Sequence, residues 1–357
     1  MPALSTSKKP RTAVKKHVVV IADWDADGAT SAAMIVYAQE YRHLYPLRGR
    51  YEVHAYPSGP RGFQDTLAEA VADSCPDVVA ILDIPLTERV YNTLVSFSRE
   101  CGSTRLVYID HHYSTLYSME KLNRLVEELY IGHKPTALLT YDVLSSLGLK
   151  RLTPRLQAFM NAVSVLEKTR KPAPHEENVV KLAASISKAS TVLRDRELWI
   201  KLVRWLASPL PMQTPFDMKM IEQVMRIAEE SDREIEEKAK ELAMSAKRIG
   251  FMKFVDARRK WRGRGASALA SKLFKILRQP VAVLIERDDG VRLLIIRSRG
   301  VKAYKIAVGL LEKGVAENIG GHSSLAVVRL RDGVEPEILE PLLRRLSFEV
   351  ERGAEAR

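Results

Sequence analysis

The chain contains few of the residues that build disulfide scaffolds, zinc sites or membrane spans. Cysteine occurs only at Cys75 and Cys101 among 357 residues, and the two do not form a Cys-x-x-Cys pair, so neither disulfide scaffolding nor structural zinc is expected. No apolar run approaches the roughly 18 residues that a membrane-spanning helix needs. The apolar stretch from Val18 to Ile21 is too short for a signal peptide. These absences predict a soluble, cytoplasmic protein without a membrane partner.

Acidic residues are outnumbered by basic ones. The chain has 56 Lys and Arg against 44 Asp and Glu, a net charge of +12 and a pI near 9.6, which together favour a polyanionic partner. Part of the excess lies in the stretch 1–16, which we expect to be a disordered tail. A second part interleaves an aromatic residue with cations, a combination suited to phosphate contacts and base stacking, at Arg258, Arg259, Trp261 and Arg262. The alternative for both is a solvated basic surface.

Strands and helices alternate along the first half of the chain. Apolar runs predict strands near residues 17–23, 52–56, 78–84 and 105–110, with helical stretches at 29–41 and 63–74. This alternation is typical of an α/β fold with a parallel sheet. Residues 136–206 are predicted to be helical, and the prolines at 209, 211 and 215 mark a boundary.

The second half begins with a long charged segment. Residues 217–247 read as one Glu- and Lys-rich helix, interpreted as a linker between domains, with a coiled-coil helix as the alternative. A small α/β domain follows, with helices expected at 267–277 and 304–313 and strands at 281–286, 291–297 and 326–329.

Carboxylates gather where three predicted strands end. Asp23, Asp25 and Asp27 alternate after the first strand, Asp83 lies at the end of another, and Asp110-His111-His112 closes a third. Because ligands collect outside the carboxyl ends of parallel strands, these side chains are expected to converge. Unpaired carboxylates so close together repel one another and raise one another's pKa. The pattern therefore predicts a site for hard divalent cations such as Mn²⁺ or Mg²⁺, with imidazole as a further ligand.

These motifs resemble those of a known family. Asp110-His111-His112 is the signature after which the DHH phosphoesterases are named, and the segment from Asp23 to Ser31 is similar to the first motif of the RecJ-type exonuclease branch. Asn318-Ile319-Gly320-Gly321-His322 resembles the Gly-Gly-His motif of the associated DHHA1-type domain, and Arg297-Ser298 matches the Arg-Ser upstream of it. The motifs occur in the family's order and span residues 18 to about 330.

The resemblance implies a domain plan. The tail at 1–16 precedes a DHH catalytic domain with a parallel sheet at 17–208, a linker helix at 209–249 and a smaller α/β domain of the DHHA1 type at 250–357. The Gly-Gly-His segment would face the first domain across a cleft.

The resemblance also implies roles for single residues. Asp23, Asp25, Asp27, Asp83 and His111 match positions that bind two Mn²⁺ ions, with Mg²⁺ as an alternative and Asp83 as the bridge. Glu167 stands where the family has a further acidic ligand, usually Asp, so it is either a ligand or an ordinary surface residue. His112 matches a residue that contacts the scissile phosphate and protonates the leaving group, and Asp110 is assigned to catalysis with it. The groups expected to hold a phosphate or the chain end of the substrate are Arg297, Ser298, Asn318, Gly320, Gly321 and His322.

Three functions remain open at this stage. The favoured one is a metal-dependent exonuclease on single-stranded DNA or RNA that releases nucleoside monophosphates in DNA repair or replication. The second is a hydrolase of short oligonucleotides or small phosphorylated nucleotides, which the two-domain length also fits. The third is a non-catalytic replication scaffold, because some relatives have lost catalysis. A helicase or replisome component is an expected partner, and the oligomeric state stays open.

Overall fold

The first domain is built on a parallel sheet. The computed structural model describes residues 16–210, 218–261, 265–322 and 324–355. The strands of the first sheet are β1 (Val18–Ala22), β2 (Val53–Pro57), β3 (Val78–Leu82), β4 (Arg105–Asp110) and β5 (Glu128–Ile131). They pair in the order β2-β1-β3-β4-β5, and every pair is parallel. β1 and β3 are completely buried because helices cover both faces, which explains their unbroken apolar runs.

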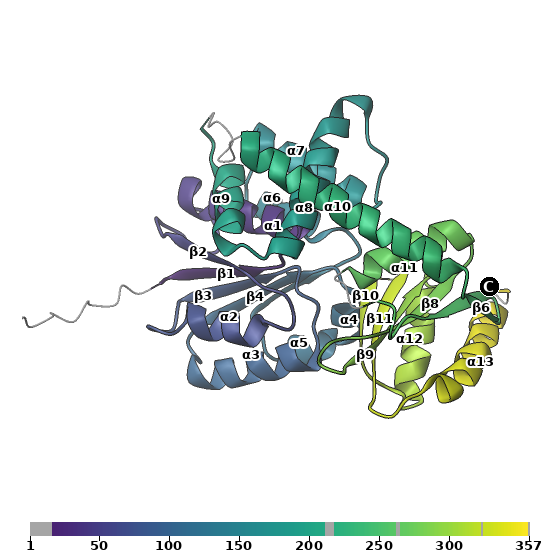
Figure 1. Ribbon diagram of the computed structural model, residues 1–357. Helices are drawn as coiled ribbons and strands as arrows, with labels where there is room; N and C mark the ends of the chain where they lie inside the picture. Colours follow the sequence, from purple (N-terminus) through teal and green to yellow (C-terminus); the bar gives the residue numbers. More distant parts are fainter. Residues whose placement is uncertain (1–15, 211–217, 262–264, 323, 356–357) are drawn as a thin grey trace, which may run out of the picture.

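Helices cover the two faces of this sheet (Figure 1). One face carries α1 (Ala26–Val36), α6 (Thr136–Ser146), α7 (Pro154–Leu166), α8 (Glu177–Leu193) and α9 (Arg196–Ala207). The other carries α2 (Phe63–Ala70), α3 (Glu88–Glu100) and the short α4 (Tyr113–Tyr117) and α5 (Met119–Leu122). A π-helical segment, Tyr37–Tyr41, extends α1, and a 3-10 turn, Pro174–Glu176, precedes α8. Along β1, Val18 and Val20 pack into one core and Val19 and Ile21 into the other, as the alternation of a strand requires.

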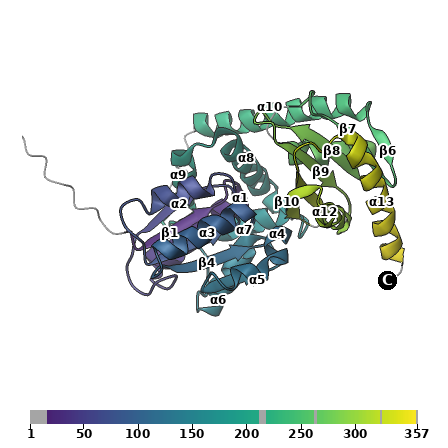
Figure 2. The same ribbon diagram turned by 90° about the horizontal axis from the view of Figure 1, so that it is seen from below.

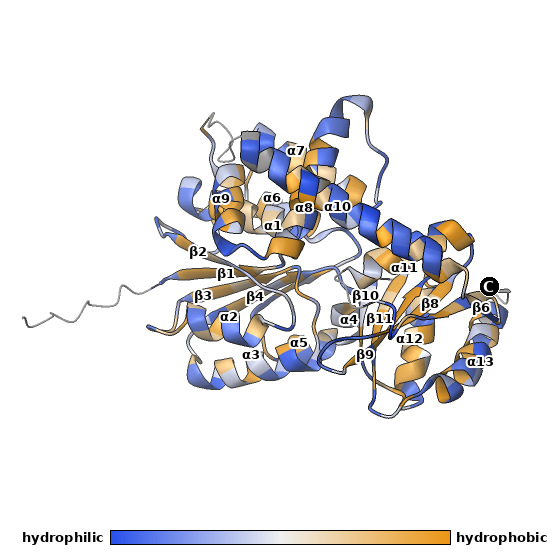
Figure 3. Ribbon diagram, in the orientation of Figure 1, coloured by the Kyte–Doolittle hydropathy of each residue, from blue (hydrophilic) through white to orange (hydrophobic). Residues whose placement is uncertain are grey.

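The second domain has its own mixed sheet. Its strands are β6 (Lys247–Ile249), β7 (Met252–Asp256), β8 (Val281–Glu286), β9 (Arg292–Arg297), β10 (Ala316–His322) and β11 (Leu325–Leu330). They pair in the order β10-β11-β9-β8-β7-β6, so β10 is an edge strand. The helices are α11 (Ala266–Leu277), α12 (Lys302–Glu312) and α13 (Pro336–Glu355). Figure 3 shows that the strands of both sheets are mostly hydrophobic, whereas the helices around them mix hydrophobic and hydrophilic residues.

One long helix runs along both domains. α10 (Met218–Ala243) spans them in both views (Figures 1 and 2). Val224 packs into the core of the first domain, whereas Ile235 and Leu242 pack with α11 in the second. In a coiled coil, a partner helix would cover these three apolar side chains. Here they are buried against other elements of the same chain. The interval 209–249 also includes β6, which pairs with β7.

The expectation that the two cysteines form no disulfide is wrong. Cys75 and Cys101 form a disulfide, with their Cα atoms 5.5 Å apart. Cys75 follows α2 and Cys101 follows α3, so the bond joins the ends of two helices on one face of the sheet. The two cysteines meet because the chain runs along β3 and returns through α3, so that the residues before the strand and after the helix lie together. The spacing of the cysteines in the sequence does not reveal this.

The fold class agrees with the prediction: an α/β domain with a parallel sheet, a long helix and a smaller α/β domain. The elements that were not predicted are α3, α4, α5, β5, β6, β7, β10 and α13. Within the described ranges, no helix has both the length and the apolar character needed to cross a membrane.

Candidate active site

The carboxyl ends of three neighbouring strands deliver the predicted acidic residues to one place. Asp23 follows β1, Asp83 follows β3 and Asp110 ends β4. The backbone N–H of Asp23 donates to the carbonyl of Leu82 (3.2 Å), and that of Asp83 donates to Ile109 (3.0 Å), so strand pairing continues up to the site. Asp83 has a φ of 59°, a left-handed conformation that is uncommon for residues with a side chain and that Asp tolerates better than most. The chain thus turns sharply at the residue expected to bridge two cations.

The turn after β1 is fixed by the start of α1. Asp25 is the N-cap, and its carboxylate accepts from the backbone N–H groups of Asp27 (2.9 Å) and Gly28 (3.1 Å). The N–H of Ala26 donates to the Ser187 hydroxyl on α8 (3.1 Å). A Cβ at Gly28 would lie 2.4 Å from the carbonyl oxygen of Asp23, so only glycine lets α1 pack this closely against the end of β1.

The N-terminus of α6 holds the next two carboxylates. Asp27 accepts from the backbone N–H groups of Thr136 (2.9 Å) and Ala137 (2.7 Å), where the helix dipole favours an anion. The hydroxyl of Thr136 donates to Asp83 (2.9 Å). No role was predicted for Thr136 or Ala137. The sequence offers one signal for them, Pro135, since a proline often stands at the start of a helix.

Four carboxylates and one imidazole thereby form overlapping groups suited to cations. Asp23, Asp25 and Asp83 offer oxygens within 4.8 Å of one another, and so do ligand atoms of Asp27, Asp83 and His111. Nε2 of His111 lies 3.4 Å from Asp83 and 3.6 Å from Asp27. Asp83 belongs to both groups, and its role as the bridge between two cations stays a prediction.

The electrostatics of this cluster are costly without cations. Burial raises the pKa of Asp23 to about 7, with a further contribution from Asp25. Burial and neighbouring carboxylates raise the pKa of Asp27 and Asp83 well above their usual range. Burial, with the neighbouring His112, lowers the pKa of His111 to about 4, so its imidazole is neutral and able to donate a lone pair. An oxygen-rich set with one neutral nitrogen fits divalent cations of the Mn²⁺ or Mg²⁺ kind.

Glu167 lies at the edge of the cluster. It is the C-cap of α7, and its pKa is raised to about 7, first by burial and then by Asp25. It also contributes to the raised pKa of Asp27. The charge of Glu167 therefore interacts with those of Asp25 and Asp27, whereas its role as a ligand stays a prediction.

The half-buried His112 pairs with the buried Asp110 beside the cluster. Nδ1 of His112 lies 2.7 Å from Asp110, whose other oxygen accepts from the Thr115 hydroxyl. Burial acts to lower the pKa of His112, but the charge and hydrogen bond of Asp110 outweigh it and raise this pKa to about 9. His112 is therefore a proton donor at neutral pH, and Asp110 fixes its ring.

The second domain contributes a third histidine. His322, at the end of β10, places its ring centroid 4.8 Å from that of His111 and 4.7 Å from that of His112, stacked on the latter at 25°. Burial and the two neighbouring histidines lower the pKa of His322 to about 2, which keeps it neutral. Gly321 has a φ of 99°, and a Cβ there would lie 2.3 Å from the carbonyl of Leu325, so the turn after β10 requires glycine. The Gly-Gly-His segment thus faces the first domain, as expected.

A cleft of about 500 Å³ opens beside these histidines between the two domains. Its lining includes Glu167 and Lys168 from the first domain and Arg297 from the second. Arg297 donates to the Ser324 hydroxyl (2.8 Å). Lys168, which the sequence analysis did not assign, adds a second cation.

Two predicted substrate residues lie elsewhere. Ser298 is buried (1% exposed), and its N–H donates to the carbonyl of Ser324, which joins β9 to the turn after β10. Asn318 lines a different pocket of the domain interface. Gly320 lies on β10 between Asn318 and His322.

The predicted stacking role of Trp261 is wrong. Its side chain is only 4% exposed and packs in a core with residues of α11, because the loop folds inward. Arg258 pairs with Asp256 (2.7 Å) and Glu335 (2.7 Å), whereas Arg259 is exposed. Arg262, like residues 1–15 of the predicted tail, lies outside the described residues.

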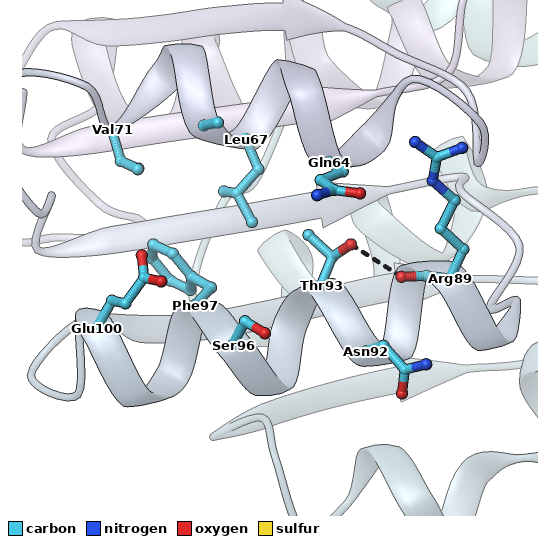
Figure 4. Close-up of a pocket in the computed structure, with 10 residues that line it drawn as sticks. Gln64, Leu67, Val71, Arg89, Asn92, Thr93, Ser96, Phe97 and Glu100 are labelled. Carbon is cyan, nitrogen blue, oxygen red and sulfur yellow. Dashed lines mark hydrogen bonds between the residues drawn. The ribbon is translucent and has the colours of Figure 1, made fainter.

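A separate groove of about 530 Å³ lies between α2 and α3 (Figure 4). Leu67 and Phe97 form its floor, and polar side chains such as Gln64 and Arg89 border it. None of the predicted site residues lines it.

No protein-family model and no curated protein matches the chain. Solved structures do resemble it. A DHH-domain protein described as a member of a family of ribosomal proteins is 14% identical with a TM-score of 0.60, over 93% of this chain and 87% of that one. RecJ from Thermus thermophilus, in complex with Mn²⁺, is 15% identical with a TM-score of 0.58 over 94% of this chain. This chain covers 52% of that RecJ, about half its length.

A structure of exonuclease RecJ bound to manganese is 14% identical, with a TM-score of 0.53 over 94% of this chain and 90% of that one. At these identities the likeness concerns the fold. The chain therefore has the two-domain fold of DHH-domain proteins such as RecJ.

Proposed function

We propose that the protein is a phosphodiesterase that requires divalent cations and removes nucleoside monophosphates from the end of single-stranded DNA or RNA, in DNA repair or replication. The observation that supports this proposal most strongly is that three groups lie together: the Asp and His cluster, the His112–Asp110 pair, and His322 from the second domain. A cleft that contains Lys168 and Arg297 leads to them.

The cluster fits two cations that share Asp83. Asp23 and Asp25 would complete one site, and Asp27 and His111 the other. Bound there, divalent cations would supply Lewis acidity towards a phosphate and a nucleophilic water at neutral pH. The proposed ligand Glu167 would add negative charge at the edge nearest Asp25.

The protein's own side chains would orient the phosphate and move the proton. Asp110 holds Nδ1 of His112, so Nε2 is the nitrogen left to protonate the leaving oxygen. Arg297 and Lys168 would hold the phosphate next to it, and the neutral His322 would hydrogen-bond it without adding charge. A phosphate held from both domains is aligned for attack before the reaction begins.

A second candidate is a hydrolase of short oligonucleotides. Two observations favour it: the cleft of about 500 Å³ lies within the range of sites for small ligands, and Trp261 is not available as a stacking platform for a long strand. A non-catalytic scaffold would have no use for the complete set of Asp23, Asp25, Asp27, Asp83 and His111.

The test compares a labelled single strand of many nucleotides with a dinucleotide, each with Mn²⁺ and with a chelator. We expect mononucleotides from the long strand in Mn²⁺ and no product in the chelator. Asp83→Asn should abolish turnover, whereas Asp142→Asn, which changes an exposed carboxylate of α6 (52% exposed), should not. Product from the dinucleotide alone would favour the second candidate, and full activity in the chelator would refute both.

A further inference from the structure

A second pocket lies at the domain interface, separate from the cleft beside the histidines. It has a volume of about 260 Å³. The first domain contributes Tyr91 of α3 and Ser114 and Tyr117 of α4, and the second domain contributes Tyr304 of α12 and Asn318 of β10. The residue that starts α4, Tyr113, lines the larger cleft instead, so α4 separates the two spaces.

Two hydroxyl groups of this pocket lack partners. Ser114 is 5% exposed and Tyr304 is 6% exposed, and neither hydroxyl has a hydrogen-bond partner among the described residues. Buried polar groups are normally paired, because leaving one unpaired is costly. Burial, followed by Tyr117 and Tyr113, raises the pKa of Tyr304, so its phenol stays protonated and is a donor without an acceptor. A ligand bound in the pocket would supply hydrogen-bond partners for these two hydroxyl groups.

The aromatic walls suit a planar ligand. Tyr117 is 61% exposed at the rim, and Tyr91 lies near it with the Lys121 amine 5.9 Å from its ring centroid. Glu317, a further lining residue, is paired with Arg329 (2.7 Å). Glu88 and Lys121 also line this pocket, so its lining carries one cation and two carboxylates, whereas the larger cleft has the two cations Lys168 and Arg297.

We propose that this pocket binds one nucleobase of a single strand whose phosphate lies at His112. The inference rests on the proposed function, since it places a neighbouring part of the same substrate. Tyr117 stacks on the base, and Ser114 and Tyr304 hydrogen-bond its edge. A volume of about 260 Å³ lies just below the roughly 300–1,000 Å³ of sites for drug-sized ligands, which fits a single base.

The position supports this assignment. His112 is the N-cap of α4, and Tyr117 lies five residues further, about 7.5 Å along the helix axis. Asn318 lies on β10, the strand that ends in His322. A base in the pocket would therefore contact both elements that deliver the catalytic histidines, and would align the strand between the domains.

The experiment compares Tyr117→Ala and Tyr304→Phe with a matched control. Tyr41→Ala serves as the control, because Tyr41 is 42% exposed on the π-helical segment, away from the pocket. The substrates are a short single strand with all its bases and strands in which one base at a time is removed. Binding is measured by fluorescence anisotropy in a chelator and turnover in Mn²⁺. Tyr117→Ala should raise Kd and KM for the intact strand by about tenfold and leave kcat unchanged. For a strand that lacks the base bound in this pocket, Kd and KM should be the same for Tyr117→Ala and for the parent.

Tyr304→Phe distinguishes a ligand contact from a structural role. It removes only the unpartnered hydroxyl, so the free protein should be as stable as the parent or slightly more stable, while the affinity for the intact strand falls. Equal affinity of all three variants for the intact strand would overturn the inference. A second result would also overturn it: free adenosine or uridine inhibits the parent, and Tyr117→Ala abolishes this inhibition without changing strand binding. The pocket would then bind free nucleosides rather than a base of the strand. Intact binding without turnover in the parent protein would count against the proposed function alone.

Discussion

The sharpest prediction concerns the stability of the metal-free protein as pH rises. Asp23 has a usual pKa of 3.8, which burial and the neighbouring Asp25 raise to about 7. Below pH 3.8 the group is protonated in both the folded and the unfolded state and costs nothing. Between about pH 4 and pH 7 the unfolded chain loses this proton first, so the free energy of unfolding decreases as pH rises. Above pH 7 the loss is complete.

The magnitude follows from the same shift. One pKa unit corresponds to about 1.4 kcal/mol, so ionisation of Asp23 costs the folded state about 2 kcal/mol near pH 5 and about 4 kcal/mol near pH 8. His111 and His322 act in the opposite direction below pH 6.5, because their lowered pKa values make the folded state lose stability as pH falls. The quantity to measure is therefore the difference between the parent protein and Asp23→Asn, in which the contributions of His111 and His322 cancel.

The assay is urea denaturation of both proteins near pH 5 and pH 8, with a chelator or with Mn²⁺. In the chelator, Asp23→Asn should be more stable than the parent, by about 2 kcal/mol near pH 5 and about 4 kcal/mol near pH 8. In Mn²⁺ at a hundred times its Kd, the parent should gain about 2.7 kcal/mol, and the variant should gain less because it has lost a ligand. If the parent is the more stable protein at pH 8 in the chelator, the account of the carboxylate cluster is refuted.

Three other predictions concern neighbouring features. If Glu167 is a ligand, calorimetric titration with Mn²⁺ should show weaker binding by Glu167→Gln and near-parent binding by Glu167→Asp, whereas parent-like affinity of the Gln variant would exclude the role. Thr136→Val removes the hydrogen bond to Asp83 and should weaken Mn²⁺ binding by about tenfold in the same titration, since groups that orient ligands have effects of this size; an unchanged Kd would contradict this. Cys75→Ser removes the disulfide to Cys101, which closes a loop of 26 residues. It should lower the free energy of unfolding, measured by denaturation without a reductant, by about 3.5 kcal/mol. A reductant that lowers the free energy of unfolding equally in parent and variant would contradict this.

The sequence predicted the strands that are buried on both faces. β1 and β3 are continuous apolar runs because helices cover both sides of the sheet, and a carboxylate follows each of them. β5 was missed because its residues, Glu128–Ile131, are only half-buried at the sheet edge and its apolar run is limited to three residues. β10 was missed because it contains the Gly-Gly-His segment, and glycine has little strand preference.

The candidate site was predicted where its residues are adjacent in sequence and missed where tertiary packing creates the contact. Asp25 and Asp27 follow one strand, so their proximity is local. Thr136 meets Asp83 only because α6 begins at the carboxyl end of the sheet. The burial of Trp261 depends on α11, which packs over its loop, so composition could not distinguish a stacking platform from a core residue.

The position of His322 explains how two separate cores form one site. α10 inserts Val224 into the first core and Leu242 into the second, so a single rigid helix sets the spacing between the domains. β10 is the edge strand of its sheet, which leaves its free side directed towards α4 and lets His322 stack on His112. Because Asp110 raises the pKa of His112, whereas burial lowers the pKa of His111 and His322, a single proton is favoured on His112 at neutral pH. Asp110 of the first domain thus decides which imidazole carries the proton, and His322 from the second domain stacks on that ring in its neutral form.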